Sequence, residues 1–351
     1  MRGNKGEWSE IYVLLKLLYD RLMYAGDENL DTIQDIFYPI LSIKRDSNVI
    51  YNIEGENNIS LIKGDGTTLH INSSNFPGLI SDLFSNISTS NETTFEIPSL
   101  TNILDTLCIS RLSASSHDKQ DIYIKFHDIR TGLINESGFS IKSMLGSSST
   151  LLNASGSTKF IFKIDLNNIS LEATRNLRAG KEVVTFLLNN GCSLNFDKTS
   201  NNIFTSNLMM TDYVMPQLLA NIILIYFSSR NSTLTSILEI IENDNFLNIP
   251  ANYLPVFYKY KIKQLLVNIA LGMMPATIWN GNFTANGGYI IVKETGDIIC
   301  YHIYDKNRFE NYLFNNIKLD TPSLSRHNCG KIYGNNGNHY IDLPLQLRFI
   351  R

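Results

Sequence analysis

The order of apolar and polar positions predicts alternating helices and strands along the chain. Apolar residues at helical spacing, such as Tyr12, Leu15 and Leu18, predict helices; the ranges are 7–19, 30–41, 76–87, 209–227, 257–271 and 307–315. Alternating or short continuous apolar runs predict strands over 121–127, 138–143, 160–164, 289–293 and 298–304, with shorter ones before residue 70 and near the C-terminal end. No repeat and no long linker interrupts the pattern, which therefore favours one integrated α/β domain over residues 1–351.

Two of the predicted strands present polar side chains on one face. In the first strand Ile122 and every second residue after it point one way, and Asp121 lies on the opposite face. In the second strand Ser140 and Lys142 share a face for the same reason. If the two strands pair as an antiparallel hairpin, Asp121 lies near both Ser140 and Lys142.

An acid at the start of one strand, followed about twenty residues later by a lysine on the next strand, is the skeleton of the PD-(D/E)xK nucleases. Phosphodiester hydrolysis uses a divalent metal that polarises the phosphoryl oxygen and activates water. Mg²⁺ requires only one or two carboxylates because it keeps several waters. A lysine beside them orients the water and stabilises the developing charge. The alternative interpretation of Asp121 and Lys142 is an ordinary surface hairpin with a solvated lysine.

The motif departs from its usual form at Ser140, where an Asp or Glu normally stands. Either a second carboxylate comes from elsewhere or the site works with fewer. The N-terminal run KGEWSE offers Glu10. This run resembles the segment by which some nucleases of the superfamily, such as archaeal Holliday-junction resolvases, bring a glutamate to the metal. Glu7 and Glu136 are the competitors, although Glu7 is also explained as a first-turn residue that the helix dipole favours.

Composition and charge narrow the class of protein. Hydrophobic residues make up 43% of the chain and charged residues 18%, which excludes a disordered protein. The formal net charge of -3 disfavours both a histone-like protein that wraps DNA and a polybasic membrane-binding protein. Residues 255–351 carry 11 Lys/Arg against 6 Asp/Glu, whereas residues 26–110 carry 3 against 12. This asymmetry is compatible with a DNA-contacting part at 255–351, although ordinary scatter explains it about as well.

Targeting and cysteine signals indicate a cytoplasmic protein. The four cysteines form no CxxC pair and are interpreted as reduced packing residues. The N-terminus lacks a signal peptide, because Glu7 and Glu10 interrupt its apolar run. The longest apolar stretch, 218–227, is about half the length that spans a bilayer, so no membrane partner is expected.

Three long blocks of sequence resemble the HpaII family of type II restriction endonucleases: GNKGEWSEIYVLLKLL at the start, GFSIKSMLGSSSTLLNASG in the middle, and the C-terminal run from GGYIIVKETGDIICYHIY through FENYLFNN to KLDTPSLSRHN. The blocks occur in order, and the resemblance runs essentially end to end. It implies a restriction-endonuclease-like core, a mixed central sheet flanked by helices, with helical and β elaborations. It also implies double-stranded DNA as substrate, hydrolysis at a short palindrome (CCGG for the family's namesake) and a cognate DNA methyltransferase as genetic partner.

The sequence therefore predicts an Mg²⁺-dependent site with a catalytic core at residues 1–20 and 110–190. Asp121 and Glu10 are the expected metal ligands, and Lys142 acts on the attacking water. Ser140 either supports the metal ligands without touching the metal or hydrogen-bonds to a metal-bound water. The candidate DNA-contacting residues are Arg326, His327, Ser143 and Asn153. A palindromic site favours a homodimer, although a monomer that nicks the strands in succession would also serve. The alternative function is a non-catalytic DNA-binding protein with a degenerate nuclease site.

Overall fold

The computed structural model describes residues 1–45, 49–113, 119–166, 169–174, 177–178 and 180–350. The chain forms two compact units, each assembled from several segments. Unit 1 comprises residues 1–149, 270–272 and 283–312, and unit 2 comprises residues 150–269, 273–282 and 313–351. The prediction of one integrated domain stays a prediction.

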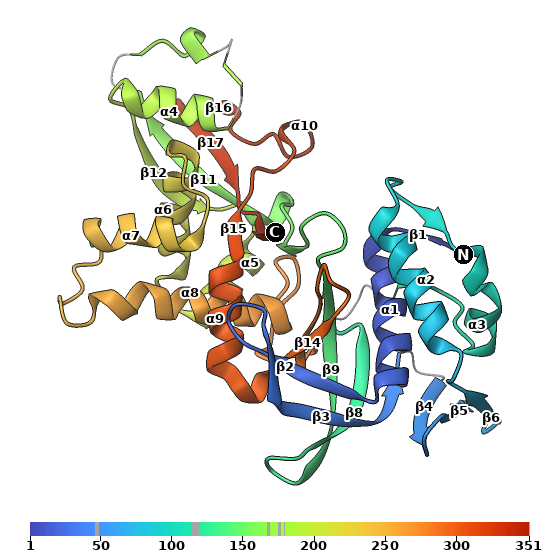
Figure 1. The fold of residues 1–351 in the computed structure, drawn as a ribbon. Coiled ribbons are helices and arrows are strands. Elements are labelled where there is room, and N and C mark those ends of the chain that lie inside the picture. The colour runs from blue at the N-terminus through green and yellow to red at the C-terminus, as the bar shows by residue number, and fades with distance from the viewer. Residues whose placement is uncertain (46–48, 114–118, 167–168, 175–176, 179, 351) are drawn as a thin grey trace. The chain divides into compact units, whose positions relative to one another are not determined.

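Unit 1 is built on a mixed sheet with the strand order β2-β14-β13-β9-β8-β3-β4-β5-β6 (Figure 1). Strand β13 runs parallel to β9, and β14 runs parallel to β2, whereas the other neighbours are antiparallel. Strand β2 also pairs with β3, so the strands from β2 to β3 form a closed circuit. Its elements are β1 Arg2–Gly3, α1 Lys5–Asp20, β2 Leu22–Gly26, β3 Thr32–Lys44, β4 Val49–Glu54, β5 Asn58–Lys63, β6 Thr68–Asn72, α2 Phe76–Thr89, β7 Phe95–Glu96, α3 Thr101–Thr106, β8 Ile122–Asp128, β9 Leu133–Ser143, β13 Gly288–Val292 and β14 Ile298–His302.

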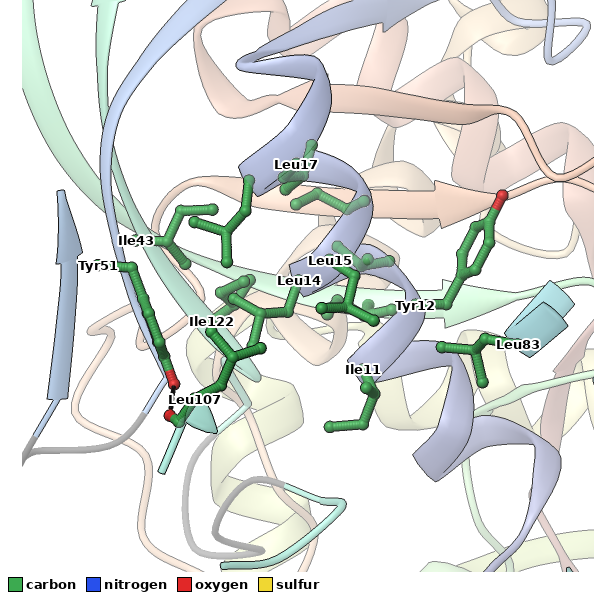
Figure 2. Packing of buried hydrophobic residues seen from close by; sticks show 14 of the residues in the cluster. Ile11, Tyr12, Leu14, Leu15, Leu17, Ile43, Tyr51, Leu83, Leu107 and Ile122 are labelled. Carbon is green, nitrogen blue, oxygen red and sulfur yellow. Dashed lines mark hydrogen bonds between the residues drawn. The ribbon is translucent and has the colours of Figure 1, made fainter. Parts of the chain in front are cut away.

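Helix α1 is the centre of the hydrophobic core of unit 1. It begins at Lys5 after Asn4, whose side chain accepts from the backbone N–H of Glu7 in a capping box. Apolar side chains around most of the helix are buried, because α1 lies between the sheet and α2 (Figure 2). The hydroxyl of Tyr51 donates to the carbonyl of Leu107 at 2.7 Å at the edge of this core. The predicted N-terminal amphipathic helix is confirmed.

The predicted helix at 30–41 is wrong, because residues 32–41 belong to strand β3. Apolar residues there recur every three or four positions, which mimics a helix. The cause is an irregularity in the pairing with β2: Ala25 pairs with Ile33, but its neighbour Tyr24 pairs with Phe37. Residues 34–36 form the bulge between these pairs and shift the phase of the alternation.

Unit 2 combines a four-stranded sheet, β12-β11-β17-β16, with a three-stranded sheet, β10-β18-β15, and several helices. The predicted helix at 209–227 is in fact two helices, α5 and α6, because the chain turns before Pro216. Helices α8 and α9 have residues in both units. The elements are β10 Thr150–Leu152, β11 Lys159–Asp165, α4 Lys181–Asn189, β12 Ser193–Thr199, α5 Asn202–Thr211, α6 Met215–Ser228, α7 Leu234–Asp244, α8 Leu254–Leu271, α9 Lys306–Asn316, β15 Ile317–Leu319, α10 Leu324–His327, β16 Ile332–Asn335, β17 Asn338–Pro344 and β18 Leu347–Phe349.

Among the described residues, no single helix has the length and apolar character needed to cross a membrane. Helices α5 and α6 meet the criterion only as a pair, which is bent by 105°.

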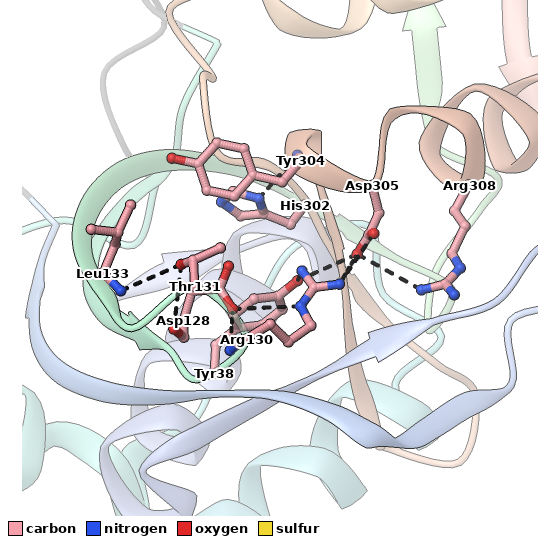
Figure 3. Close-up of polar contacts among 9 residues, drawn as sticks. All are labelled: Tyr38, Asp128, Arg130, Thr131, Leu133, His302, Tyr304, Asp305 and Arg308. Atoms are coloured by element: carbon pink, nitrogen blue, oxygen red, sulfur yellow. Dashed lines mark hydrogen bonds and ion pairs between the residues drawn. The ribbon is translucent and has the colours of Figure 1, made fainter.

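A partly buried polar network ties the far end of β8 to the segment after β14 (Figure 3). The Arg130 guanidinium contacts Asp128 at 3.4 Å and Asp305 at 3.3 Å, and it donates to the Tyr38 hydroxyl at 2.9 Å. His302 packs against the Tyr38 ring, and its Nδ1 accepts from the backbone N–H of Tyr304. Burial lowers the pKa of His302 to about 4; the charge of Arg130 adds to this shift, and those of Asp128 and Asp305 oppose it.

This network predicts acid sensitivity of the fold. Between about pH 6.5 and pH 4 the unfolded chain protonates His302 and the folded chain does not, so stability falls as the pH falls. The loss amounts to roughly 3 kcal/mol over that interval. His302→Asn keeps an acceptor for Tyr304 and removes the titration. Urea unfolding at pH 7.5, 6 and 5 should give a flatter stability profile for this variant; parallel profiles would contradict the assignment.

Candidate active site

The predicted hairpin of β8 and β9 is confirmed, and it brings Asp121, Ser140 and Lys142 together. Asp121 Oδ2 accepts from the backbone N–H of Ile141 at 2.6 Å and from the Ser140 hydroxyl at 3.1 Å. Ser140 Oγ in turn accepts from Lys142 Nζ at 2.9 Å. Ser140 is 2% exposed, so its hydroxyl acts as a fixed link between the carboxylate and the ammonium. The three side chains form one hydrogen-bonded cluster at the start of β8.

Strand β13 supplies an aromatic wall to this cluster. Tyr289 is the register partner of Ser140 on the neighbouring parallel strand, so its ring lies on the same face. Lys142 Nζ lies 5.2 Å from the centre of this ring, a cation–π contact. The Tyr289 hydroxyl is held by the carbonyl of Ala270 at 3.4 Å. Burial and the nearby charge of Asp121 raise the pKa of Tyr289, so the phenol stays neutral at physiological pH.

Sequence reasoning missed Lys119, which lies at the same end of the hairpin. Lys119 stands two residues before Asp121, and Lys142 two residues after Ser140. Because the strands are antiparallel, the Asp121–Ser140 contact brings both lysines to one end. Burial and the charge of Lys142 lower the pKa of Lys119 to about 8, and Asp121 opposes this shift. The signal was present in the sequence, because Lys119 and Asp121 share the parity that placed Ser140 beside Lys142.

Glu10 lies on α1 in an ion pair that the sequence did not predict. Its carboxylate is 3.1 Å from the guanidinium of Arg45, and the two side chains are only 13% and 7% exposed. Arg45, which follows β3, also donates to the carbonyls of Arg111 and Leu112. The charge of Glu10 is therefore already balanced in part by a buried cation.

The N-terminal end of α1 is fastened to the end of β9 next to the cluster. The Ser9 hydroxyl donates to that of Ser143 at 2.8 Å, and Lys5 Nζ donates to the carbonyl of Leu145 at 3.3 Å. These contacts fix the turn of α1 that carries Glu10 close to the strand that carries Lys142. Ser143 Oγ also accepts from the backbone N–H of Leu145 at 3.2 Å.

Glu7 and Glu136, the alternatives to Glu10 as the second carboxylate, lie in different surroundings. Glu7 Oε2 accepts from the backbone N–H of Asn4 at 2.8 Å, so this side chain completes the N-terminal cap of α1. Glu136 is exposed on β9, four residues before Ser140. Four strand residues span about 13 Å, which separates Glu136 from the cluster.

Comparison with known proteins identifies the family of this chain. The family model described as HpaII restriction endonuclease matches residues 4–349. The chain is 42% identical to the type II restriction enzyme HpaII of Haemophilus parainfluenzae, over 99% of this chain and 98% of that enzyme. The chain belongs to the HpaII restriction endonuclease family. This member of the family is a type II restriction endonuclease, a site-specific deoxyribonuclease that acts on DNA. No solved structure matches the chain.

The donor set of this restriction endonuclease is compatible with Mg²⁺. Asp121 Oδ2 takes both hydrogen bonds described above, and within the described residues no donor lies on Asp121 Oδ1. One carboxylate oxygen is thus free to act as a ligand for a hard cation. Among all the residues that the structure describes, no three His, Cys, Asp or Glu side chains lie close enough together to hold a metal ion. A bound Mg²⁺ would therefore use one or two carboxylates and keep several waters.

The candidate DNA-contacting residues are divided between the two units of the enzyme. Ser143 lies in unit 1, where its hydroxyl is engaged with α1 as described. Asn153 is exposed just after β10 in unit 2. Arg326 is exposed and His327 half-buried in the short helix α10, also in unit 2. Their part in DNA binding stays a prediction.

Proposed function

We propose that this restriction endonuclease hydrolyses double-stranded DNA in an Mg²⁺-dependent reaction at a short palindrome, CCGG as for the family's namesake. The proposal extends to a restriction-endonuclease-like core formed by the β8–β9 hairpin, its neighbouring strands and α1. The observation that carries it is the cluster of Asp121, Ser140 and Lys142, in which a carboxylate and an ammonium converge through one buried hydroxyl.

Each side chain has a defined task in this mechanism. Asp121 would hold the metal, and Ser140 keeps both Asp121 and Lys142 in place. When bound, the divalent cation supplies Lewis-acid polarisation of the phosphodiester. Lys142 orients the attacking water and donates to the charge that develops on the phosphoryl oxygens. Glu10 is the proposed second carboxylate.

Beyond the active site, we propose that Arg326, His327, Ser143 and Asn153 contact DNA, with 255–351 as the main contacting segment. The enzyme would act in the cytoplasm beside a cognate methyltransferase, and a homodimer would match the symmetry of its palindrome.

A plasmid of known sequence, incubated with the enzyme and Mg²⁺, tests this function. Discrete fragments whose ends map to CCGG are expected, and no cleavage is expected in EDTA. A protein that has kept only DNA binding would shift the plasmid in a gel without cutting it. Ends that map to another palindrome would retain the nuclease and correct the recognised sequence.

Arg326 offers a test of base readout. Arginine bridges O6 and N7 of guanine in the major groove, and Arg326 is an exposed cation in unit 2. Arg326→Ala should therefore weaken binding to a cognate oligonucleotide by roughly 1–3 kcal/mol and binding to random DNA much less. Titrations of both duplexes in Ca²⁺ measure the difference, and an equal loss on both would assign Arg326 to the phosphate backbone.

A further inference from the structure

Two lysines of unit 1 lie at the end of the hairpin that carries Asp121. Lys119 and Lys142 are both half-buried there, because the antiparallel strands and the Asp121–Ser140 contact bring them to the same end. Within the described residues, the ammonium of Lys119 donates no hydrogen bond and forms no ion pair, whereas Lys142 donates to Ser140. Like charges that lie close together destabilise a fold. Within the described residues, the proposed catalytic cluster thus carries two ammonium groups beside the carboxylate of Asp121.

Hydrogen bonds fix the backbone at Lys119 and at Asp121. The N–H of Lys119 donates to the Thr284 hydroxyl at 3.3 Å, and the N–H of Asp121 donates to the carbonyl of Phe139 at 2.8 Å. Lys119 is thus held against the strands of the site. A like-charge pair that costs stability is expected at a functional site, where a ligand compensates for it.

We propose that Lys119 is a further catalytic residue, whose ammonium donates to a non-bridging oxygen of the scissile phosphodiester. This inference rests on the proposed function of Asp121 and Lys142. A phosphodiester carries one negative charge in the ground state and gains more on its oxygens as the water attacks. Lys119 approaches the site from the segment before β8 and Lys142 from β9, so they can contact two different oxygens of the same phosphate. Neither lysine replaces the metal, because one carboxylate oxygen of Asp121 remains available to it.

The central experiment compares Lys119→Met with Lys125→Met under single-turnover conditions, with saturating enzyme and Mg²⁺. Lys125 is a matched control because it is an exposed lysine of β8, the strand that follows Lys119; it lies opposite Glu136 and about 20 Å from Lys119. Lys119→Met should lower the cleavage rate by about 100-fold or more, as when one donor to a transition-state oxyanion is removed. Lys125→Met should cleave like the wild type, and Lys119→Arg should recover most of the activity because it restores the charge.

Thermal unfolding distinguishes catalysis from a structural role. Because Lys119→Met relieves the repulsion from Lys142, its melting temperature should equal or exceed that of the wild type while its activity is lost. Activity that falls together with the melting temperature, or a cleavage rate within threefold of the wild type, would overturn the proposal. Asp121→Asn distinguishes a failure of the Lys119 proposal from a failure of the proposed active site. If Asp121→Asn is inactive and Lys119→Met is not, only the role of Lys119 is wrong; if Asp121→Asn is active, the proposed site itself is wrong.

Discussion

Replacing Lys142 by methionine is expected to abolish DNA cleavage, with a loss of about 10³-fold or more in the single-turnover rate. Methionine keeps the apolar part of the side chain against Tyr289 and removes the ammonium that donates to Ser140. Binding of a cognate oligonucleotide in Ca²⁺ should stay within about tenfold, or roughly 1.4 kcal/mol, because the lysine acts mainly in the transition state.

Asp121→Asn should give the same loss for a different reason. The amide oxygen still accepts from the backbone N–H of Ile141, so the hairpin is preserved, but the negative charge that would hold Mg²⁺ is gone. Lys125→Met again serves as the control. Cleavage at the wild-type rate by either Lys142→Met or Asp121→Asn would move the active site away from this hairpin.

A test of Glu10 must take account of its ion pair with Arg45. Glu10→Gln alone removes the anion that pairs with the guanidinium of Arg45, which is only 7% exposed. Breaking a buried pair in this way costs roughly 3–5 kcal/mol, so a loss of activity would be ambiguous. The informative comparison is Arg45→Met with and without Glu10→Gln. In Arg45→Met the guanidinium no longer competes with the metal for the carboxylate of Glu10, and Mg²⁺ should raise the melting temperature more than in the wild type.

If Glu10 is the second carboxylate, adding Glu10→Gln to Arg45→Met should remove this stabilisation by Mg²⁺. It should also raise the Mg²⁺ concentration required for half-maximal cleavage by at least about tenfold, or 1.4 kcal/mol. Glu7→Gln and Glu136→Gln should leave that concentration unchanged, since Glu7 caps α1 and Glu136 is exposed along β9. A double variant with the Mg²⁺ dependence of Arg45→Met would reduce Glu10 to a structural partner of Arg45.

The sequence predicted those parts of the fold in which local pattern and tertiary structure agree. Helix α1 and the strands around Asp121 and Lys142 follow their apolar spacing, so the hairpin and the cluster of Asp121, Ser140 and Lys142 could be found by parity alone. Strand β3 could not, because the bulge opposite Tyr24 imposes a helical spacing on a strand. The break before Pro216 is a similar case, because one continuous apolar pattern covers two helices.

Contacts between distant segments account for the rest of the site. No sequence feature near Glu10 predicts its ion pair with Arg45, because the two residues meet only when α1 packs beside the end of β3. Lys119 could have been found by extending the parity argument one step upstream of Asp121. Its surroundings could not, because burial and the approach of Lys142 depend on the pairing of the strands.

The segmented construction of unit 1 sets an order of events during synthesis. Strand β13, which lies beside β9 and carries Tyr289, begins about 145 residues after β9 ends. At roughly 5–20 residues per second, the ribosome needs roughly 7–30 s to reach it. Until then β9 has no partner on that side, and Lys142 lacks its aromatic wall. The nascent chain therefore carries Asp121 and Lys142 before the strand that completes their surroundings has been made.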